Sequence, residues 1–291
     1  MTLKTNIRAM KKTLVLIAAA AGLTLAAQPA LAAGGESKPL RSGGFSFEGP
    51  FGSFDRNQLQ RGYKVYREVC ASCHGMELMH FRNLAEPGGP FFDSHQASPA
   101  ENRWVKALAK ENQIADIDTE TGEPLMREGT AADRFPNPYP NATAAAAANG
   151  GAAPPDLSVM AKARSGGADY IYSLLTGYAA VPQGLQIRPG QYYNEYMAGD
   201  LTPFMPEGAH VPAGGFIAMP NPLTAGQVTY DDDTVASVDQ MAKDVSAYIA
   251  WASDPRQVQR KQTGLGVLIF LFIFAGITYL SYRRIWKGVA H

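Results

Sequence analysis

Cysteine is almost absent from the 291-residue chain, which contains only Cys70 and Cys73. A structural disulfide between them is a poor explanation, because closing a two-residue gap removes little entropy from the unfolded chain. An excess of charge is also missing, since 26 basic residues balance 26 acidic ones. This balance argues against a nucleic-acid-binding protein, which typically carries a basic surface.

Charge is absent from two stretches, one near each end. Residues 264–282 contain no charged side chain and are flanked by basic residues on both sides, which predicts a transmembrane anchor. Residues 13–27 are also uncharged; they follow a basic segment and precede the small-residue sequence Ala30-Leu31-Ala32. This pattern predicts a cleaved signal peptide at residues 1–32 rather than a retained anchor, because the apolar run is short for a membrane span.

The two ends together predict a three-part chain. Residues 33–260 would form a periplasmic domain, and residues 261–291 would form the membrane anchor and a short cytoplasmic tail. In a bacterium this gives a single-pass inner-membrane protein. Between the signal peptide and the tail, 26 acidic residues face 19 basic ones, a net charge of −7. A soluble partner that docks there is therefore expected to be basic.

The two cysteines belong to the sequence Cys70-Ala71-Ser72-Cys73-His74. A thioredoxin-like redox pair would need a βαβ setting, whereas the residues before Cys70 have helical spacing. Covalent haem c attachment accounts for all three functional positions: the cysteines form two thioethers and His74 coordinates the iron. The sequence therefore predicts one covalently bound haem c.

The sixth iron ligand decides between electron transfer and ligand or peroxide chemistry. Met219 ranks first, because Pro220 and Pro222 make its loop stiff and extended. Met76 and Met79 follow His74 too closely to reach the opposite face of a haem, and Met241 falls in an amphipathic helical pattern. The other candidates remain open: Met126, Met160, Met197, Met205, His80, His95 and His210. His291 would lie beyond the membrane.

The wider sequence resembles the cytochrome c1 family, the haem subunits of the quinol–cytochrome c reductase (cytochrome bc1) complex. The resemblance covers nearly all of the mature chain and includes the single C-terminal anchor. Its motifs are Phe47-Glu48-Gly49-Pro50-Phe51-Gly52, Arg61-Gly62-Tyr63-Lys64-Val65-Tyr66, the haem motif, Phe135-Pro136-Asn137-Pro138-Tyr139, Ala153-Pro154-Pro155-Asp156-Leu157-Ser158, Ala163-Arg164, the residues from Asp169 to Tyr178, and the Met219 loop.

The resemblance implies roles for individual residues. His74 and Met219 would be the iron ligands, and Arg164 would neutralise a haem propionate. Residues implied to line the haem crevice are Asn149, Pro154, Pro155 and Tyr170. Some bacterial members have an additional cysteine pair that braces the ligand loop; this chain has none, so packing and prolines are expected to hold that loop.

The expected architecture is a mainly α, class I cytochrome c-like haem domain with long irregular loops at residues 80–160, plus one C-terminal transmembrane helix. Asp55 is expected to cap a helix leading to Cys70. Further helices are predicted over residues 169–178 and 231–252, the latter with Val235 and Met241 on its apolar face. A last helix is predicted to begin at Asp254-Pro255, and the Ala- and Gly-rich residues 142–153 are expected to be loose.

The implied function is electron transfer without catalysis by the chain itself, since quinol oxidation would occur elsewhere in the complex. The chain would accept electrons from a Rieske iron–sulfur protein and pass them to a soluble c-type cytochrome, with cytochrome b as a further partner. The alternatives are an independent membrane-anchored cytochrome c and an exported peroxidase. A peroxidase is disfavoured because many such enzymes use two haems, and this chain has a single attachment motif.

Overall fold

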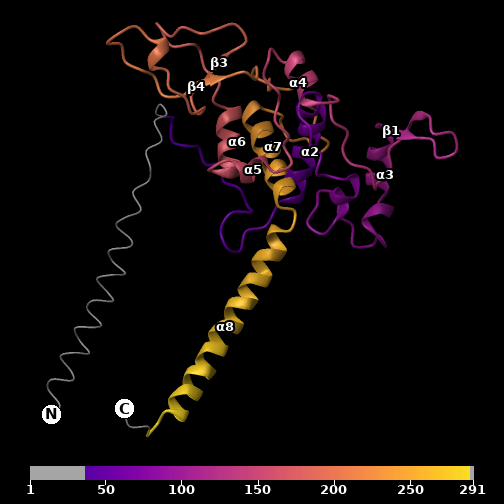
Figure 1. Cartoon of the computed structure of the whole chain (residues 1–291), viewed down its shortest axis with the longest axis vertical. Coiled ribbons are helices and arrows are strands. Elements are labelled where there is room, and N and C mark those ends of the chain that lie inside the picture. The colour runs from indigo at the N-terminus through magenta and orange to yellow at the C-terminus, as the bar shows by residue number, and fades with distance from the viewer. Residues whose placement is uncertain (1–36, 289–291) are drawn as a thin grey trace.

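The computed structural model describes residues 37–288, so the predicted signal peptide at residues 1–32 lies outside the described residues. Figure 1 shows a head of short helices and small sheets from which one long helix extends as a rod. The mainly α prediction is confirmed. The helices are α2 (Arg56–Glu68), α3 (Arg103–Lys110), α4 (Ala142–Ala148), α5 (Met160–Ala163), α6 (Gly167–Leu175), α7 (Val238–Ser253) and α8 (Gln257–Ile285).

Two small antiparallel sheets lie on opposite sides of the head (Figure 1). One is the hairpin of β1 (Gln113–Ile117) and β2 (Pro124–Glu128). The other pairs β3 (Tyr192–Asn194) with β4 (Gly215–Ile217), in a register that places Tyr192 opposite Ile217. Between them, α2, α5, α6 and α7 pack together and form the centre of the head.

Helices α2 and α7 cross in close contact at Gly62. As predicted, α2 begins after Asp55, whose carboxylate accepts a hydrogen bond from the Gln58 amide at 2.7 Å. A Cβ atom at Gly62 would collide with the Asp244 carbonyl of α7 and lie 2.7 Å from the Tyr248 Cβ. Glycine at this position therefore allows the two helices to approach closely.

Aromatic rings fill the core beneath this crossing. The ring of Tyr248 lies 5.6 Å from that of Tyr63 and 5.7 Å from that of Tyr66. Phe135 extends the cluster, 6.2 Å from Tyr66 and 4.8 Å from Phe81. Large buried rings contribute strongly to core stability, so the helix that precedes Cys70 is anchored in the best-packed part of the head.

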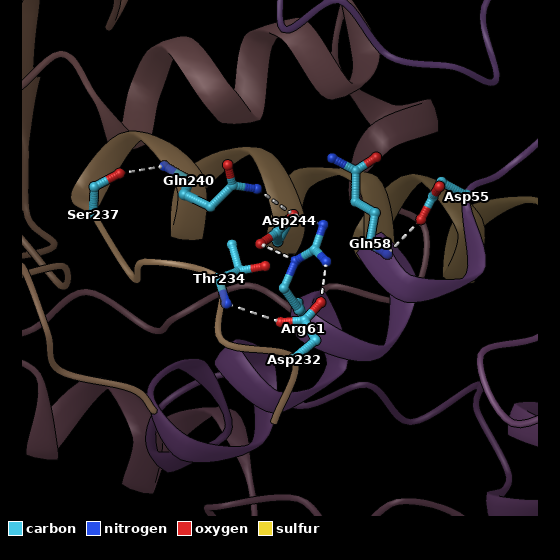
Figure 2. Close-up of polar contacts among 8 residues, drawn as sticks. All are labelled: Asp55, Gln58, Arg61, Asp232, Thr234, Ser237, Gln240 and Asp244. Carbon is cyan, nitrogen blue, oxygen red and sulfur yellow. Dashed lines mark hydrogen bonds and ion pairs between the residues drawn. The ribbon is translucent and has the colours of Figure 1, made fainter. Parts of the chain in front are cut away.

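Helix α7 begins seven residues later than predicted. Its N-cap is Ser237, whose hydroxyl accepts a hydrogen bond from the Gln240 amide. Of the preceding acidic residues, Asp232 pairs with Arg61 instead of capping a helix (Figure 2). Its carboxylate lies 2.6 Å from the Arg61 guanidinium, which also contacts Asp244 at 3.0 Å. Val235, predicted to be on the apolar face, is 80% exposed, whereas Met241 is buried.

Other element boundaries also differ from the predictions. Residues 80–160 contain α3, the β1–β2 hairpin and α4, where irregular loops were expected. Seven residues of the segment expected to be loose form α4, because alanine strongly favours helix and the Asn141 side chain caps the first turn. The helix predicted over 169–178 is α6, which ends at Leu175.

Helix α8 carries the predicted membrane span. Its most apolar window has a mean hydropathy of 2.2 and none of that window is buried in the head. It begins at Gln257, two residues beyond the predicted start, and Asp254 caps the end of α7 instead. The Lys261 ammonium donates a hydrogen bond to the Phe47 carbonyl at 2.6 Å, which joins α8 to the head.

Candidate haem-binding site

The two cysteines and His74 lie on one turn of the chain directly after helix α2. After α2 ends, residues Cys70–Ser72 form a 3₁₀ turn. The amides of Cys73 and His74 both donate to the Cys70 carbonyl, at 3.1 and 2.8 Å. The two thiols are not joined to each other. Both sheets in the described residues are antiparallel, so the βαβ setting of a thioredoxin-like pair is absent from residues 37–288.

The His74 ring is fixed by one of its two nitrogens. Its Nδ1 lies 2.7 Å from the Pro155 carbonyl oxygen, to which it donates a hydrogen bond as an N–H. Burial lowers the pKa of the imidazole, so the neutral ring is favoured. In this tautomer Nε2 has a free lone pair, the state that a metal-ligating histidine requires.

Pro155 belongs to a segment that is tied to the residues after His74. The Leu157 amide donates to the Gly75 carbonyl at 2.9 Å. Asp156 accepts from the Glu77 amide at 2.8 Å, and Ser158 accepts from the Leu78 amide at 3.1 Å. Pro154-Pro155 is therefore part of the wall beside His74.

Asn149 also lies close to the attachment motif. It ends α4, and its amide nitrogen donates to the Tyr139 hydroxyl at 3.1 Å and to the Ala145 carbonyl at 2.8 Å. The Tyr139 hydroxyl in turn lies 3.9 Å from the Cys73 sulfur. The contact through Tyr139 thus connects the predicted crevice residue Asn149 with one of the two thiols.

Met219 follows β4 and lies 145 residues after His74 in the sequence. The residue is partly buried and packs against the main hydrophobic core. Its carbonyl accepts a hydrogen bond from the Tyr178 hydroxyl at 3.0 Å, and burial raises the pKa of that phenol, which keeps it protonated as a donor. Met76, Met79 and Met241 are buried in the core at 0%, 3% and 0% exposure, so none of them can leave it without unpacking the head.

Residues 45–289 match the model of the Cytochrome C1 family. The chain belongs to the cytochrome c1 family. It is similar to the cytochrome c1 of Rhodospirillum rubrum, with 39% identity over 94% of this chain and 96% of that protein. It also resembles the mitochondrial cytochrome c1 haem protein of Saccharomyces cerevisiae, with 40% identity over 84% of this chain and 71% of that protein. A match of 42% identity to cytochrome b/c1 of Bradyrhizobium diazoefficiens covers 94% of this chain and only 39% of that longer protein.

Membership of the cytochrome c1 family means that the chain carries one covalently bound haem c and acts in electron transfer. The described side chains fit this group, because two unpaired thiols and a histidine with one free nitrogen lie on a single turn. Within residues 37–288 no group of three or more His, Cys, Asp or Glu residues is placed to hold a bare metal ion. The alternative of an independent membrane-anchored cytochrome is not favoured.

The two remaining residues that the cytochrome c1 resemblance singled out are Arg164 and Tyr170. Arg164 is exposed at the end of α5, and its guanidinium donates to the neighbouring Ala163 carbonyl at 3.2 Å. Tyr170 is partly buried on α6, and its hydroxyl lies 3.9 Å from the Met197 sulfur. Among the described residues, neither side chain forms a hydrogen bond or ion pair with Cys70 or His74.

Sequence reasoning missed the residues that hold the cytochrome c1 site together. Asp156 and Ser158 fasten the wall beside His74, and Tyr178 holds Met219. A Cβ at Gly75 would collide with the Asn137 side-chain oxygen and lie 3.1 Å from an Asp156 carboxylate oxygen, so both side chains pack closely against this glycine. Asp156, Ser158 and Tyr178 lie inside the quoted motifs, but the contacts join residues 41 to 80 positions apart, which no local pattern reveals.

Proposed function

We propose that the chain is the haem subunit of a quinol–cytochrome c reductase complex, taking electrons from a Rieske iron–sulfur protein and passing them to a soluble c-type cytochrome. The observation that carries this proposal is the His74 ring, held through Nδ1 by the Pro155 carbonyl beside two unpaired thiols. The head that holds it is joined to one helix long and apolar enough to cross a membrane.

Four residues would hold the haem. The sulfurs of Cys70 and Cys73 would form the thioethers, and His74 Nε2 and the Met219 sulfur would bind the iron. When bound, the haem supplies a one-electron iron couple. The Pro155 carbonyl keeps the His74 proton on Nδ1, which fixes the orientation of the ring. A thioether as sixth ligand keeps other ligands off the iron and raises its potential, as electron transfer requires.

Other side chains would line the haem crevice. Arg164 would pair with a propionate, and its exposed guanidinium has a carbonyl partner and no carboxylate partner among the described contacts. The remaining lining residues of this proposal are Asn149, Pro154, Pro155 and Tyr170. None of them makes or breaks a bond, so the chain sets potential, distance and docking while quinol oxidation occurs elsewhere in the complex.

The proposed orientation places the head in the periplasm and the tail after α8 in the cytoplasm. It follows from a signal peptide cleaved after Ala32, and N-terminal sequencing of the mature chain should begin at Ala33. The domain would span residues 33–260, followed by the anchor and tail at 261–291. With its excess of 26 acidic over 19 basic residues, the exported part would favour a cytochrome with a basic docking face.

Purification in mild detergent tests the assignment to the complex. An affinity tag on the C-terminal tail should recover the chain together with cytochrome b and a Rieske protein in equal amounts. Membranes from cells with the untagged chain control for non-specific capture. Recovery of the haem-loaded chain without those two partners would overturn the proposal, because an independent cytochrome needs neither of them.

A further inference from the structure

The Met219 loop has few backbone donors with which to hold itself in place. Pro220 and Pro222 lack an N–H, and between them the Asn221 side chain only accepts a hydrogen bond from the Leu223 amide at 3.2 Å. The chain also has no cysteine outside the haem motif, so a disulfide cannot brace the loop. The hydrogen bond that the Met219 carbonyl accepts from the Tyr178 hydroxyl is therefore important for holding the loop in place.

We infer that Tyr178 is the positioning residue of the ligand loop: its hydroxyl, by holding the Met219 carbonyl at 3.0 Å, keeps the thioether directed at the iron. The inference rests on the proposed role of Met219 as axial ligand. Because Met219 precedes a proline, its backbone is already biased towards an extended conformation. One hydrogen bond to the Met219 carbonyl then restrains rotation of the peptide plane between Met219 and Pro220.

Tyr178 can act in this way because its own backbone is firmly placed. It pairs with Asn194 in an isolated antiparallel bridge beside β3. Asn194 is fully buried; its amide nitrogen donates to the Leu174 carbonyl of α6, and its amide oxygen accepts from the Tyr196 amide. A Cβ at Gly177 would lie 2.5 Å from the Tyr196 ring, so the turn into Tyr178 also packs tightly.

Besides the packing of Met219 against the main core, its segment has two polar attachments, and both are linked to β3. The ladder between β3 and β4 fixes the chain up to Ile217, and the Tyr178 hydroxyl fixes the ligand residue two positions later. Removing the hydroxyl leaves the ladder intact. The loop would then open more often, and an opened iron accepts carbon monoxide whereas a closed, methionine-ligated iron does not.

The test uses the full-length, haem-loaded chain in native membranes. For Tyr178→Phe we expect about a five-fold rise in the fraction of ferrous haem that binds carbon monoxide, the effect of one neutral hydrogen bond. The methionine–iron absorption band of the ferric form should weaken in parallel. Thermal unfolding of the variant, measured alongside, should stay close to that of the wild-type chain.

Tyr193→Phe is the matched control. It also removes a phenol hydroxyl that donates to a backbone carbonyl of the same segment, but at Ala213, before β4. We expect its carbon monoxide binding to remain at the wild-type level. An equal rise in both variants would overturn the inference, because general loosening of the segment would then explain the effect.

Met219→Leu separates this inference from the proposed function. Full carbon monoxide binding in Met219→Leu with wild-type behaviour in Tyr178→Phe would leave the ligand assignment standing and overturn the positioning role. Wild-type behaviour in Met219→Leu would overturn the ligand assignment and the positioning role together. The inference stands only if Met219→Leu is fully reactive and Tyr178→Phe is intermediate.

Discussion

His74 follows a helix of the central core, whereas Met219 follows a three-residue strand at the edge of the head. On the His74 side, α2 packs against α7 over an aromatic cluster, and the wall around Pro155 is fastened by three hydrogen bonds. On the Met219 side, β3 and β4 pack on a small separate cluster whose buried members are Leu185, Tyr193 and Leu201, while the partly buried Met219 side chain packs against the main core. The two proposed ligands thus follow elements that pack on clusters of different size.

Because of this difference, we expect one side to control the stability of the head and the other to control the environment of the iron. Damage to the α2–α7 side should lower the stability of the whole head, since most of the buried apolar surface lies there. Damage to the Met219 side should alter the iron environment while leaving the core folded, because local openings are easiest where buried contacts are few. The variants below test whether stability and redox potential can be changed separately.

The largest effect is expected for Met219→Leu. The haem should remain attached through Cys70 and Cys73, but the midpoint potential should fall on the order of 0.2 V, within the ~0.8 V range that axial ligands control. That is more than a thousandfold change in the one-electron equilibrium. Redox titration of membranes measures the fall, with Met126→Leu, an exposed methionine of the hairpin, as control. An unchanged potential would move the sixth ligand to another residue.

Arg61→Met should destabilise the α2–α7 side with little change in potential. The variant leaves the fully buried Asp244 carboxylate without its cation, which costs about 3 kcal/mol in free energy of unfolding. Burial raises the pKa of the Asp244 carboxyl, so the loss should shrink as the pH falls and the carboxyl takes up a proton. Denaturant unfolding at pH 7 and pH 5 measures both effects.

Lys64→Met is the matched control for Arg61→Met on the same helix. Its ion pair at 2.8 Å is with Asp231, which is 88% exposed, and such pairs contribute at most about 1 kcal/mol. Equal losses for the two variants would mean that burial of Asp244 does not matter. A fall in midpoint potential in Arg61→Met would show that stability and redox potential cannot be changed separately.

The smallest effect is expected at a contact within the central group of helices, between α6 and α7. The Tyr172 hydroxyl of α6 donates to Asp239 of α7 at 2.6 Å, and this bond, with Lys243, lowers the pKa of the Asp239 carboxyl. Because the folded pKa lies below the unfolded value of about 4, the contribution is present above pH 4 and is lost as the pH falls through the folded pKa. It should stay under about 1 kcal/mol, since the carboxylate is 56% exposed.

Comparison of the wild type with Asp239→Asn isolates this contribution from the other carboxylates. The difference in free energy of unfolding between the two proteins should be present at pH 6 and should shrink as the pH falls below about 4. Hydrogen exchange of the α6 amides gives a local measure of the same loss. A difference that stays constant with pH would show that the ionised carboxylate is not what joins α6 to α7.

Helix propensity, capping and motif spacing correctly predicted the features that depend on residues close together in the sequence. The Asp55 cap, the helix leading to Cys70, the haem motif and the apolar span of α8 all follow from residues within a few turns of one another. The same rules misplaced the start of α7, because Asp232 binds Arg61, 171 residues earlier, instead of capping a helix. They also missed α4, where a run of alanine looked like a loop although it favours helix.

The sequence by itself determined the covalent haem, the membrane anchor and the family of this chain, because each depends on short motifs or on composition. Only the tertiary structure decided how the two proposed ligand residues are held. His74 is oriented by a carbonyl 81 residues away, and Met219 by a hydroxyl 41 residues away. Such contacts depend on how distant segments pack, which local propensity and spacing do not encode.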